Sequence, residues 1–185
     1  VTLMGYDFAR GETAQLIPQA NMATFGPSED VVAYIHVNRI TEVRSIYTAN
    51  LTNDEQRLLI PEFEFYDLGR PLFSADGQWI YFVVLENPLD DMSEESALRN
   101  LLLGSPAYAH ENHNLPADWW RKSLNSGIAE QVTELSIIIH DGSFSADGNH
   151  LAFSTEEGVY VMGVDGGEPQ LLIISRAIRD IYWAE

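Results

Sequence analysis

The feature that most constrains the fold of this sequence is a ten-residue segment that recurs along it. Residues 73–82 read Phe-Ser-Ala-Asp-Gly-Gln-Trp-Ile-Tyr-Phe, and residues 144–153 read Phe-Ser-Ala-Asp-Gly-Asn-His-Leu-Ala-Phe. A looser copy begins at Phe25, and the beginning of a fourth copy is seen near Trp183. Sequences with spaced internal repeats fold as arrays of one supersecondary unit, so every copy should build the same structure.

Each copy has the residue order of a tight turn between two antiparallel strands. An aromatic residue ends the first strand, and Ser-Ala-Asp-Gly follows, in which Asp caps the turn and Gly supplies a positive φ. In the next strand side chains alternate between the two faces, so Ile80 and Phe82 should lie opposite Trp79, Tyr81 and Val83. The pattern predicts a hairpin.

A second hairpin should follow each copy, with turns at 52–54, 125–127 and 165–168 and a further one at 10–12. Each unit then contains four antiparallel strands, which we label A to D in chain order. Four-stranded units that repeat about every 40 residues are typical of β-propeller blades. The sequence therefore predicts an all-β fold made of such blades.

The motifs resemble the WD-like repeat of TolB-type β-propellers. The resemblance rests on Ser-Ala-Asp-Gly with its flanking aromatic residues and on residues 160–169, Tyr-Val-Met-Gly-Val-Asp-Gly-Gly-Glu-Pro. It extends over nearly the whole chain apart from one insertion. It implies a location outside the cytoplasm, periplasmic or extracellular. It implies no single function, because these repeats occur in periplasmic scaffolds, secreted binding proteins and peptidase domains.

The phase of the repeats predicts a single propeller segment over residues 1–185. Its parts are a partial blade at 1–18, full blades at 22–60, 69–135 and 140–174, and the start of a next blade at 178–185. A closed ring usually needs at least four blades. We therefore expect the chain to be part of a longer propeller.

One blade carries an insertion, residues 86–118, between its strands B and C. Asp91 and Ser93 offer N-caps, an apolar stripe follows, and Gly104 and Pro106 end the pattern, which predicts a short amphipathic helix. Blade connections alternate between the two faces, so the insertion should share its face with the D-to-A links. Long insertions on rigid scaffolds often carry recognition, and this face is the predicted binding surface.

Charge restricts the classes of partner. Lys and Arg number 10 against 28 Asp and Glu, which gives a formal net charge of −18. Such a surface repels nucleic acid and suits a protein partner with a basic surface, although solubility alone also explains the acidity. The absence of cysteine excludes disulfides and thiolate sites. No apolar run is long enough for a transmembrane segment.

Four residues stand three positions before the strand-A aromatic residues and should ring one mouth of the central channel: Met22, Arg70, Asp141 and Asp180. With His140, the two aspartates could bind a cation such as calcium or a basic side chain of a partner. The alternative is an Arg70–Asp141 ion pair that joins adjacent blades, because propeller channels are usually filled by side chains.

Two further groups are candidates for binding. Trp119 and Trp120 could form a stacking platform, with one indole between blades and the other pointing outwards, or they could both serve the core. His110, Glu111 and His113 could ligate zinc, but a polar loop explains the same residues. No other cofactor is expected.

Signatures of catalysis are missing from the sequence. It contains no Gly-x-Ser-x-Gly, P-loop, Gly-x-Gly-x-x-Gly or His-Glu-x-x-His pattern. The sequence favours a non-catalytic propeller module that binds a protein or supports an assembly. The alternatives are the cap or gating domain of a larger hydrolase and a propeller that binds a small ligand or metal.

Overall fold

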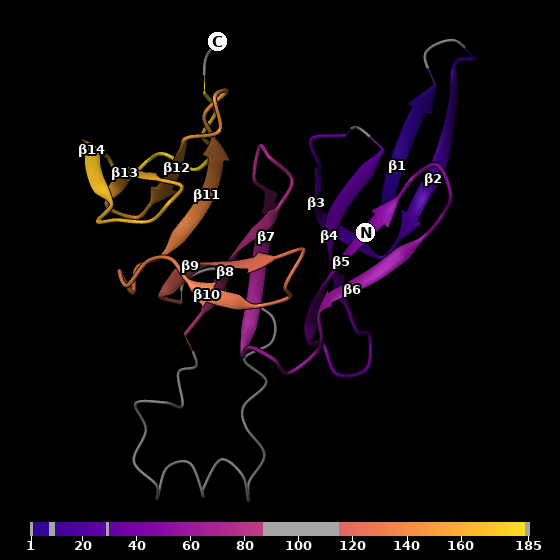
Figure 1. Cartoon of the computed structure of the whole chain (residues 1–185), viewed down its shortest axis with the longest axis horizontal. Helices are drawn as coiled ribbons and strands as arrows, with labels where there is room; N and C mark the ends of the chain where they lie inside the picture. Colours follow the sequence, from indigo (N-terminus) through magenta and orange to yellow (C-terminus); the bar gives the residue numbers. More distant parts are fainter. Residues whose placement is uncertain (1, 8–9, 29, 87–114, 184–185) are drawn as a thin grey trace, which may run out of the picture.

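A computed structural model of the chain describes residues 2–7, 10–28, 30–86 and 115–183, and these ranges form antiparallel sheets (Figure 1). The strands are β1 (Thr2–Asp7), β2 (Glu12–Pro18), β3 (Ala20–Phe25), β4 (Val31–Val37), β5 (Arg44–Asn50), β6 (Gln56–Ile60), β7 (Asp67–Phe73), β8 (Trp79–Leu85), β9 (Ala117–Ser123), β10 (Ala129–Gln131), β11 (Ile139–Phe144), β12 (His150–Thr155), β13 (Gly158–Gly163) and β14 (Gln170–Ile174). The predicted helix falls within 87–114 and lies outside the described residues.

The strands form three four-stranded sheets and one two-stranded sheet. The sheets are β3–β6, β7–β10 and β11–β14, each in chain order, with the hairpin β1–β2 before them. The first strands β3, β7 and β11 contact one another in sequence, so the sheets stand like blades around a common axis (Figure 1). The predicted all-β fold of four-stranded blades is confirmed.

One predicted strand is not formed. Residues 178–185 were expected to begin strand A of a further blade, but the structure assigns no strand to 178–183, the part that it describes. A strand needs a hydrogen-bonded neighbour, and no described strand pairs with this segment. It is instead held against the third blade, where the Trp183 Nε1–H donates to the Ser143 carbonyl oxygen at 2.9 Å.

The Ser-Ala-Asp-Gly turns have the predicted chemistry. In the second blade the Ser74 hydroxyl donates to the Asp76 carboxylate at 2.6 Å, and this carboxylate accepts the Gln78 amide at 2.9 Å. The Trp79 amide donates to the Ser74 oxygen at 3.0 Å. Gly77 adopts a φ of 67°, and the third blade repeats the turn. Ser and Asp therefore fix the register of the A–B hairpins of the second and third blades.

These turns predict an unusual titration. Hydrogen bonds from Ser145 first, and then from Asn149, lower the pKa of the exposed Asp147 from 3.8 to about 2. We expect Ser145→Ala to raise this pKa towards 3.8, and Asn149→Ala to raise it less, as measured by carboxyl NMR titration. Since the folded pKa lies below the unfolded one, the stabilisation is present above pH 3.8 and is lost as the pH falls through about 2. An unchanged midpoint in Ser145→Ala would contradict this assignment.

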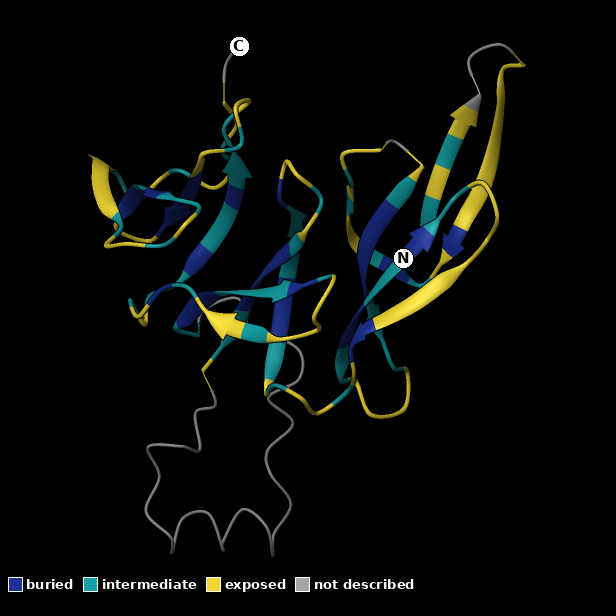
Figure 2. Cartoon of the chain, in the orientation of Figure 1, coloured by how far each residue is buried: buried dark blue, intermediate teal, exposed yellow. Residues whose placement is uncertain are grey.

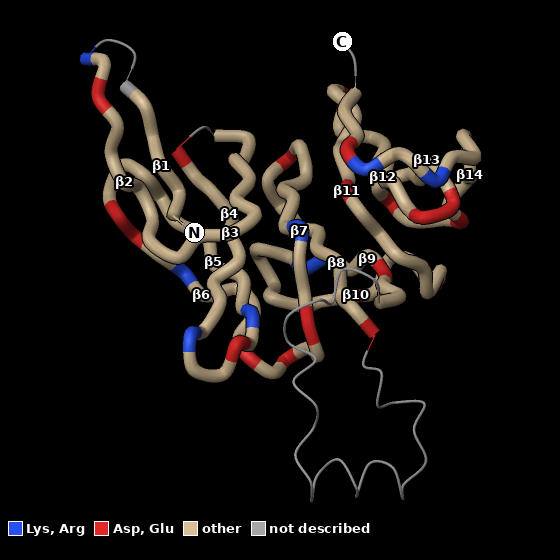
Figure 3. The backbone as a smooth tube through the Cα atoms, turned by 180° about the vertical axis from the view of Figure 1, so that it is seen from behind, with Lys and Arg blue, Asp and Glu red and all other residues tan. Residues whose placement is uncertain are grey.

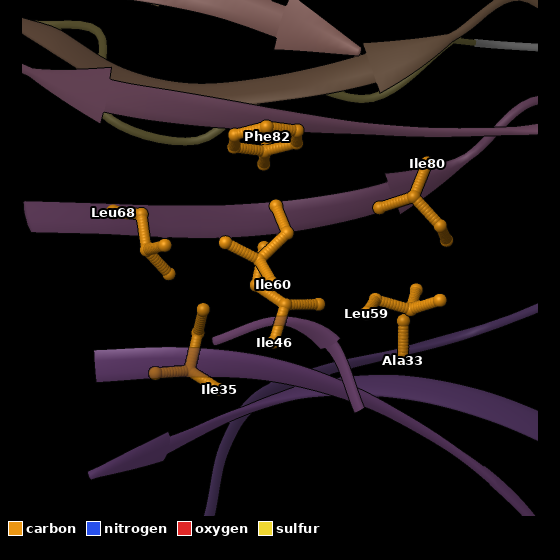
Figure 4. Packing of buried hydrophobic residues seen from close by; sticks show 8 residues of the cluster. All are labelled: Ala33, Ile35, Ile46, Leu59, Ile60, Leu68, Ile80 and Phe82. Carbon is orange, nitrogen blue, oxygen red and sulfur yellow. The ribbon is translucent and has the colours of Figure 1, made fainter. Parts of the chain in front are cut away.

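The middle blade buries both faces of its sheet. Ile80 and Phe82 pack against the first blade, with Ile35, Ile46 and Ile60 (Figure 4). The alternate residues Tyr81 and Val83 belong to a second cluster, shared with the third blade. Figure 2 shows the second strands of the blades, β4, β8 and β12, as largely buried and the outermost strand β14 as exposed. The predicted alternation is confirmed, and the blades are held together by side-chain packing.

The innermost strands carry β-bulges that the sequence did not indicate. Register shifts occur between Asn21 and Thr24 in β3, between Gly69 and Leu72 in β7, and at the corresponding place in β11. Within the first two bulges Met22 has a φ of 48° and Arg70 a φ of 52°. Bulges bend a strand and redirect a side chain, and here they lie where strand A borders the channel.

Candidate functional site

The base of the insertion and the links between blades lie on the same face. The Glu86 amide donates to the Pro116 carbonyl oxygen at 2.8 Å, which closes the base of the insertion. Residues 84–86 border the same groove as residues 64–66 and 134–136, which belong to D-to-A links. The A–B turn at 74–78 lies at the opposite end of β7 (Figure 1). We call the side with the insertion the insertion face.

Three depressions are described on this face, and one of them, lined by Ile138, His140, Glu156, Glu157, Arg176 and Arg179, adjoins the first of the two discussed below. The first, which we call the channel mouth, has a volume of about 260 Å³ and its polar lining is Arg44, Arg70, His140, Arg179 and Asp180. Met22 and Leu115 also line it. Met22, Arg70 and Asp180, three of the four residues predicted to ring the channel, thus lie at one cavity, together with the end of the insertion.

The fourth ring residue, Asp141, forms an ion pair. Arg70 Nη1 lies 3.1 Å from Asp141 Oδ1, and the other carboxylate oxygen accepts the Ile181 amide at 3.4 Å. This is the pair between adjacent blades that the sequence left open as an alternative to a cation site. Burial lowers the pKa of Arg70, although Asp141 and Asp180 oppose this shift and the group stays charged.

His140 and Arg179 lie side by side at the channel mouth. Arg179 Nη1 is 3.5 Å from His140 Nδ1. Burial, followed by the charges of Arg179 and Arg70, lowers the pKa of His140. The imidazole is therefore neutral at pH 7 and sits in positively charged surroundings.

The two tryptophans pack on opposite faces of the middle blade. Trp119 is fully buried and lies 6.2 Å from the Phe153 ring of the third blade. Trp120 is half-buried, and its ring lies 5.1 Å from Phe65 in the link after the first blade. Trp119 is therefore a core residue, whereas Trp120 does not simply point outwards, because it packs against Phe65 and lines a groove.

That groove, which we call the acidic groove, is the second depression, with a volume of about 550 Å³. Its lining is Glu64, Phe65, Tyr66, Val84, Leu85, Glu86, Asp118, Trp120, Gln131, Glu134 and Ser136. Four carboxyl groups and three aromatic rings thus meet on the insertion face. Sequence reasoning did not find the groove, because its four acids come from four segments that only the fold brings together.

Hydrogen bonds hold the deepest acid of the groove in place. The Asp118 carboxylate accepts the Thr133 hydroxyl and the Leu135 amide, both at 2.7 Å. Burial raises the pKa of Asp118, the nearby Glu86 adds to the rise, and the hydrogen bonds oppose it. Glu64 is paired with Lys122 at 3.2 Å. Glu86 and Glu134 complete the acidic lining of the groove.

The zinc candidates His110, Glu111 and His113 lie outside the described residues. Elsewhere, within the described ranges, no group of three or more His, Asp or Glu side chains is arranged to hold a metal ion. The same ranges contain no helix capable of spanning a membrane.

Known families and curated proteins offer no match to this sequence. Solved structures do match. TolB from Acinetobacter baumannii superposes with a TM-score of 0.65 and 17% identity, over 92% of this chain and 37% of TolB. The fold is that of a TolB-like β-propeller. At this identity the similarity establishes the fold alone.

Other solved structures match over a similar share of this chain. A chain of a nidogen/laminin complex aligns with 91% of this propeller segment and 55% of its own length, at a TM-score of 0.60 and 7% identity. Acylaminoacyl peptidase from Pyrococcus horikoshii aligns with 93% of this segment and 28% of its own length, at a TM-score of 0.56 and 13% identity. The chain thus spans between 28% and 55% of these three structures.

Proposed function

We propose that this propeller segment is a non-catalytic module that binds a protein with a basic surface through its insertion face. The observation that supports the proposal is the acidic groove. Its carboxylates can pair with a Lys or Arg side chain of the partner, and the aromatic rings in its lining can contact the same cation through their π faces. Periplasmic or extracellular location follows as a proposal from the similarity to TolB.

The charge of the whole chain supports the same partner. A net charge of −18 attracts a basic surface at long range, and the groove offers a defined place for it to dock. The match to a chain of a nidogen/laminin complex shows that related architecture occurs in a protein–protein complex. The insertion, whose base borders the groove, would add contacts of its own.

An arginine-rich peptide tests the proposal by fluorescence anisotropy. We expect the double variant Glu86→Gln/Glu134→Gln to weaken binding by about tenfold, because it removes two carboxylates from the groove. Binding should also weaken as salt is added, since dissolved ions screen the attraction between the acidic groove and the basic peptide. Thermal denaturation would show that the variant remains folded.

The matched control is Glu168→Gln, which removes an exposed carboxylate from a C–D turn on the other face. It should leave the affinity within about twofold of the parent. Equal weakening by the control, or binding that is independent of salt, would exclude the groove as the docking site.

The competing function is a cap or gating domain of a larger hydrolase. The match to acylaminoacyl peptidase favours it, since 93% of this chain aligns with only 28% of that enzyme. The coding sequence on either side of this chain distinguishes the two. A Gly-x-Ser-x-Gly domain there would favour the hydrolase, and further blades alone would favour the binding module.

A further inference from the structure

Basic residues are scarce in this chain, yet they gather at the channel mouth. The sequence has 10 Lys and Arg in 185 residues, and the guanidinium groups of Arg44, Arg70 and Arg179 line this one cavity. Figure 3 shows basic segments on β7 and beside β12, and further basic residues are spread over the other blades. A cluster of cations in a protein of charge −18 indicates a local requirement for positive charge.

Two of these arginines are held from within the fold. Arg44 Nη1 lies 3.4 Å from Asp67 and donates to the Leu68 carbonyl oxygen at 3.2 Å. Arg70 is held by Asp141. Both side chains keep contact with solvent, with exposed fractions of 24% and 31%. Each guanidinium has five N–H donors, so an anchored arginine can still donate to a ligand.

The third arginine has no such anchor. Arg179 is exposed and, among the described residues, forms no ion pair with a carboxylate. The one described polar contact of its side chain is with the imidazole of His140, while its backbone carbonyl oxygen accepts the Ser154 hydroxyl at 3.0 Å. Burial first, and then the charges of Arg179 and Arg70, lower the pKa of His140, whereas the nearby Glu156 opposes the shift. The same charge that disfavours an imidazolium favours an anion.

Some residues that line the cavity have unfavourable or irregular backbone conformations. Met22 and Arg70 are non-glycine residues in the left-handed region, and His140 is the extra residue where the register of β11 shifts. Strained residues that persist in a fold tend to cluster at ligand sites, where they direct side chains. The three inner strands β3, β7 and β11 each carry such a distortion. The residues concerned, Met22, Arg70 and His140, all line this cavity.

We propose that the channel mouth binds a small organic carboxylate, with Arg70 and Arg179 as its charged ligands and His140 as a neutral hydrogen-bonding partner. A planar guanidinium matches a carboxylate through two parallel hydrogen bonds. A volume of about 260 Å³ suits a small molecule. Asp180, which lines the cavity, and the net charge of −18 disfavour a compact phosphate dianion, whose two charges share one group, more strongly than a dicarboxylate, whose two charges lie at opposite ends of the molecule. This site is distinct from the acidic groove and selects the opposite charge.

Calorimetric titration of the 185-residue chain with succinate tests the proposal. Binding should saturate at one succinate per chain, and Arg179→Gln should weaken it by about tenfold or more. The matched control is Arg57→Gln on the outer strand β6, which removes the same charge from an exposed site and should leave the affinity unchanged. Amide NMR signals of residues 69–70 and 139–141 should shift on titration, and those of 56–58 should not.

A short peptide with a free C-terminus and its amidated form distinguish the source of the carboxylate. Tighter binding of succinate assigns the site to a free small molecule, and tighter binding of the free-acid peptide assigns it to a chain terminus; both outcomes support a carboxylate site. The proposal fails if succinate does not saturate, if Arg57→Gln weakens binding as much as Arg179→Gln, if inorganic phosphate binds more tightly than succinate, or if the amidated peptide binds as well as the free acid.

Discussion

Trp119→Ala is expected to lower the free energy of unfolding by about 3–5 kcal/mol. The indole is completely buried between the second and third blades, against Phe153. Among the described residues its Nε1–H has no hydrogen-bond partner, so the expected loss arises from packing. Replacing the ring with a methyl group leaves a cavity where two sheets meet, and neither sheet can close it without moving its whole ladder.

Urea unfolding followed by circular dichroism measures this effect. Phe63→Ala is the control, because that ring is 73% exposed and its removal should change stability by about 0.5 kcal/mol or less. If Trp119→Ala cost no more than Phe63→Ala, the second and third blades would not share the core described above.

Gly142→Ala is expected to destabilise the chain by about 1–3 kcal/mol. A methyl group at this position would lie 2.6 Å and 2.9 Å from two atoms of the Trp119 ring. The ring cannot retreat, because it is packed on its other side by the core of the same cluster. The strand or the indole must therefore shift.

The test of this contact is a double-mutant cycle. In a Trp119→Ala background the obstruction is gone and the added methyl group fills part of the cavity, so Gly142→Ala should then cost close to nothing. The two changes should therefore be non-additive by about 1–3 kcal/mol. Gly163→Ala serves as control, since its methyl group would meet only a carbonyl oxygen at 3.6 Å. Additive effects of the two changes would refute the contact.

Local sequence signals were sufficient to predict the four-stranded blades. Ser74, Asp76 and Gly77 specify a turn through contacts that span at most five residues, so the turn could be predicted without the rest of the fold. The alternation of Ile80 and Tyr81 predicted two buried faces, because a strand that is apolar on both sides must be covered on both. Short-range chemistry and periodicity account for what was predicted correctly.

The candidate sites were harder to predict from the sequence than the blades. Met22 and Arg70 are not residue types that signal a positive φ, so the bulges that place them arise from tertiary packing. The acidic groove combines Glu64, Asp118 and Glu134, which are far apart in sequence. Residues 178–183 have the pattern of a strand but lack a partner, and pattern alone cannot supply one.

The bulges have a consequence for how such a channel can diversify. Met22, Arg70 and His140 stand where the ladder of each inner strand is already interrupted, so their side chains are decoupled from the pairing that holds the blade together. Exchanging one of them changes the chemical character of the pore while the surrounding scaffold keeps its hydrogen bonds. A single architecture can thereby acquire new ligand preferences through a few substitutions at fixed backbone positions.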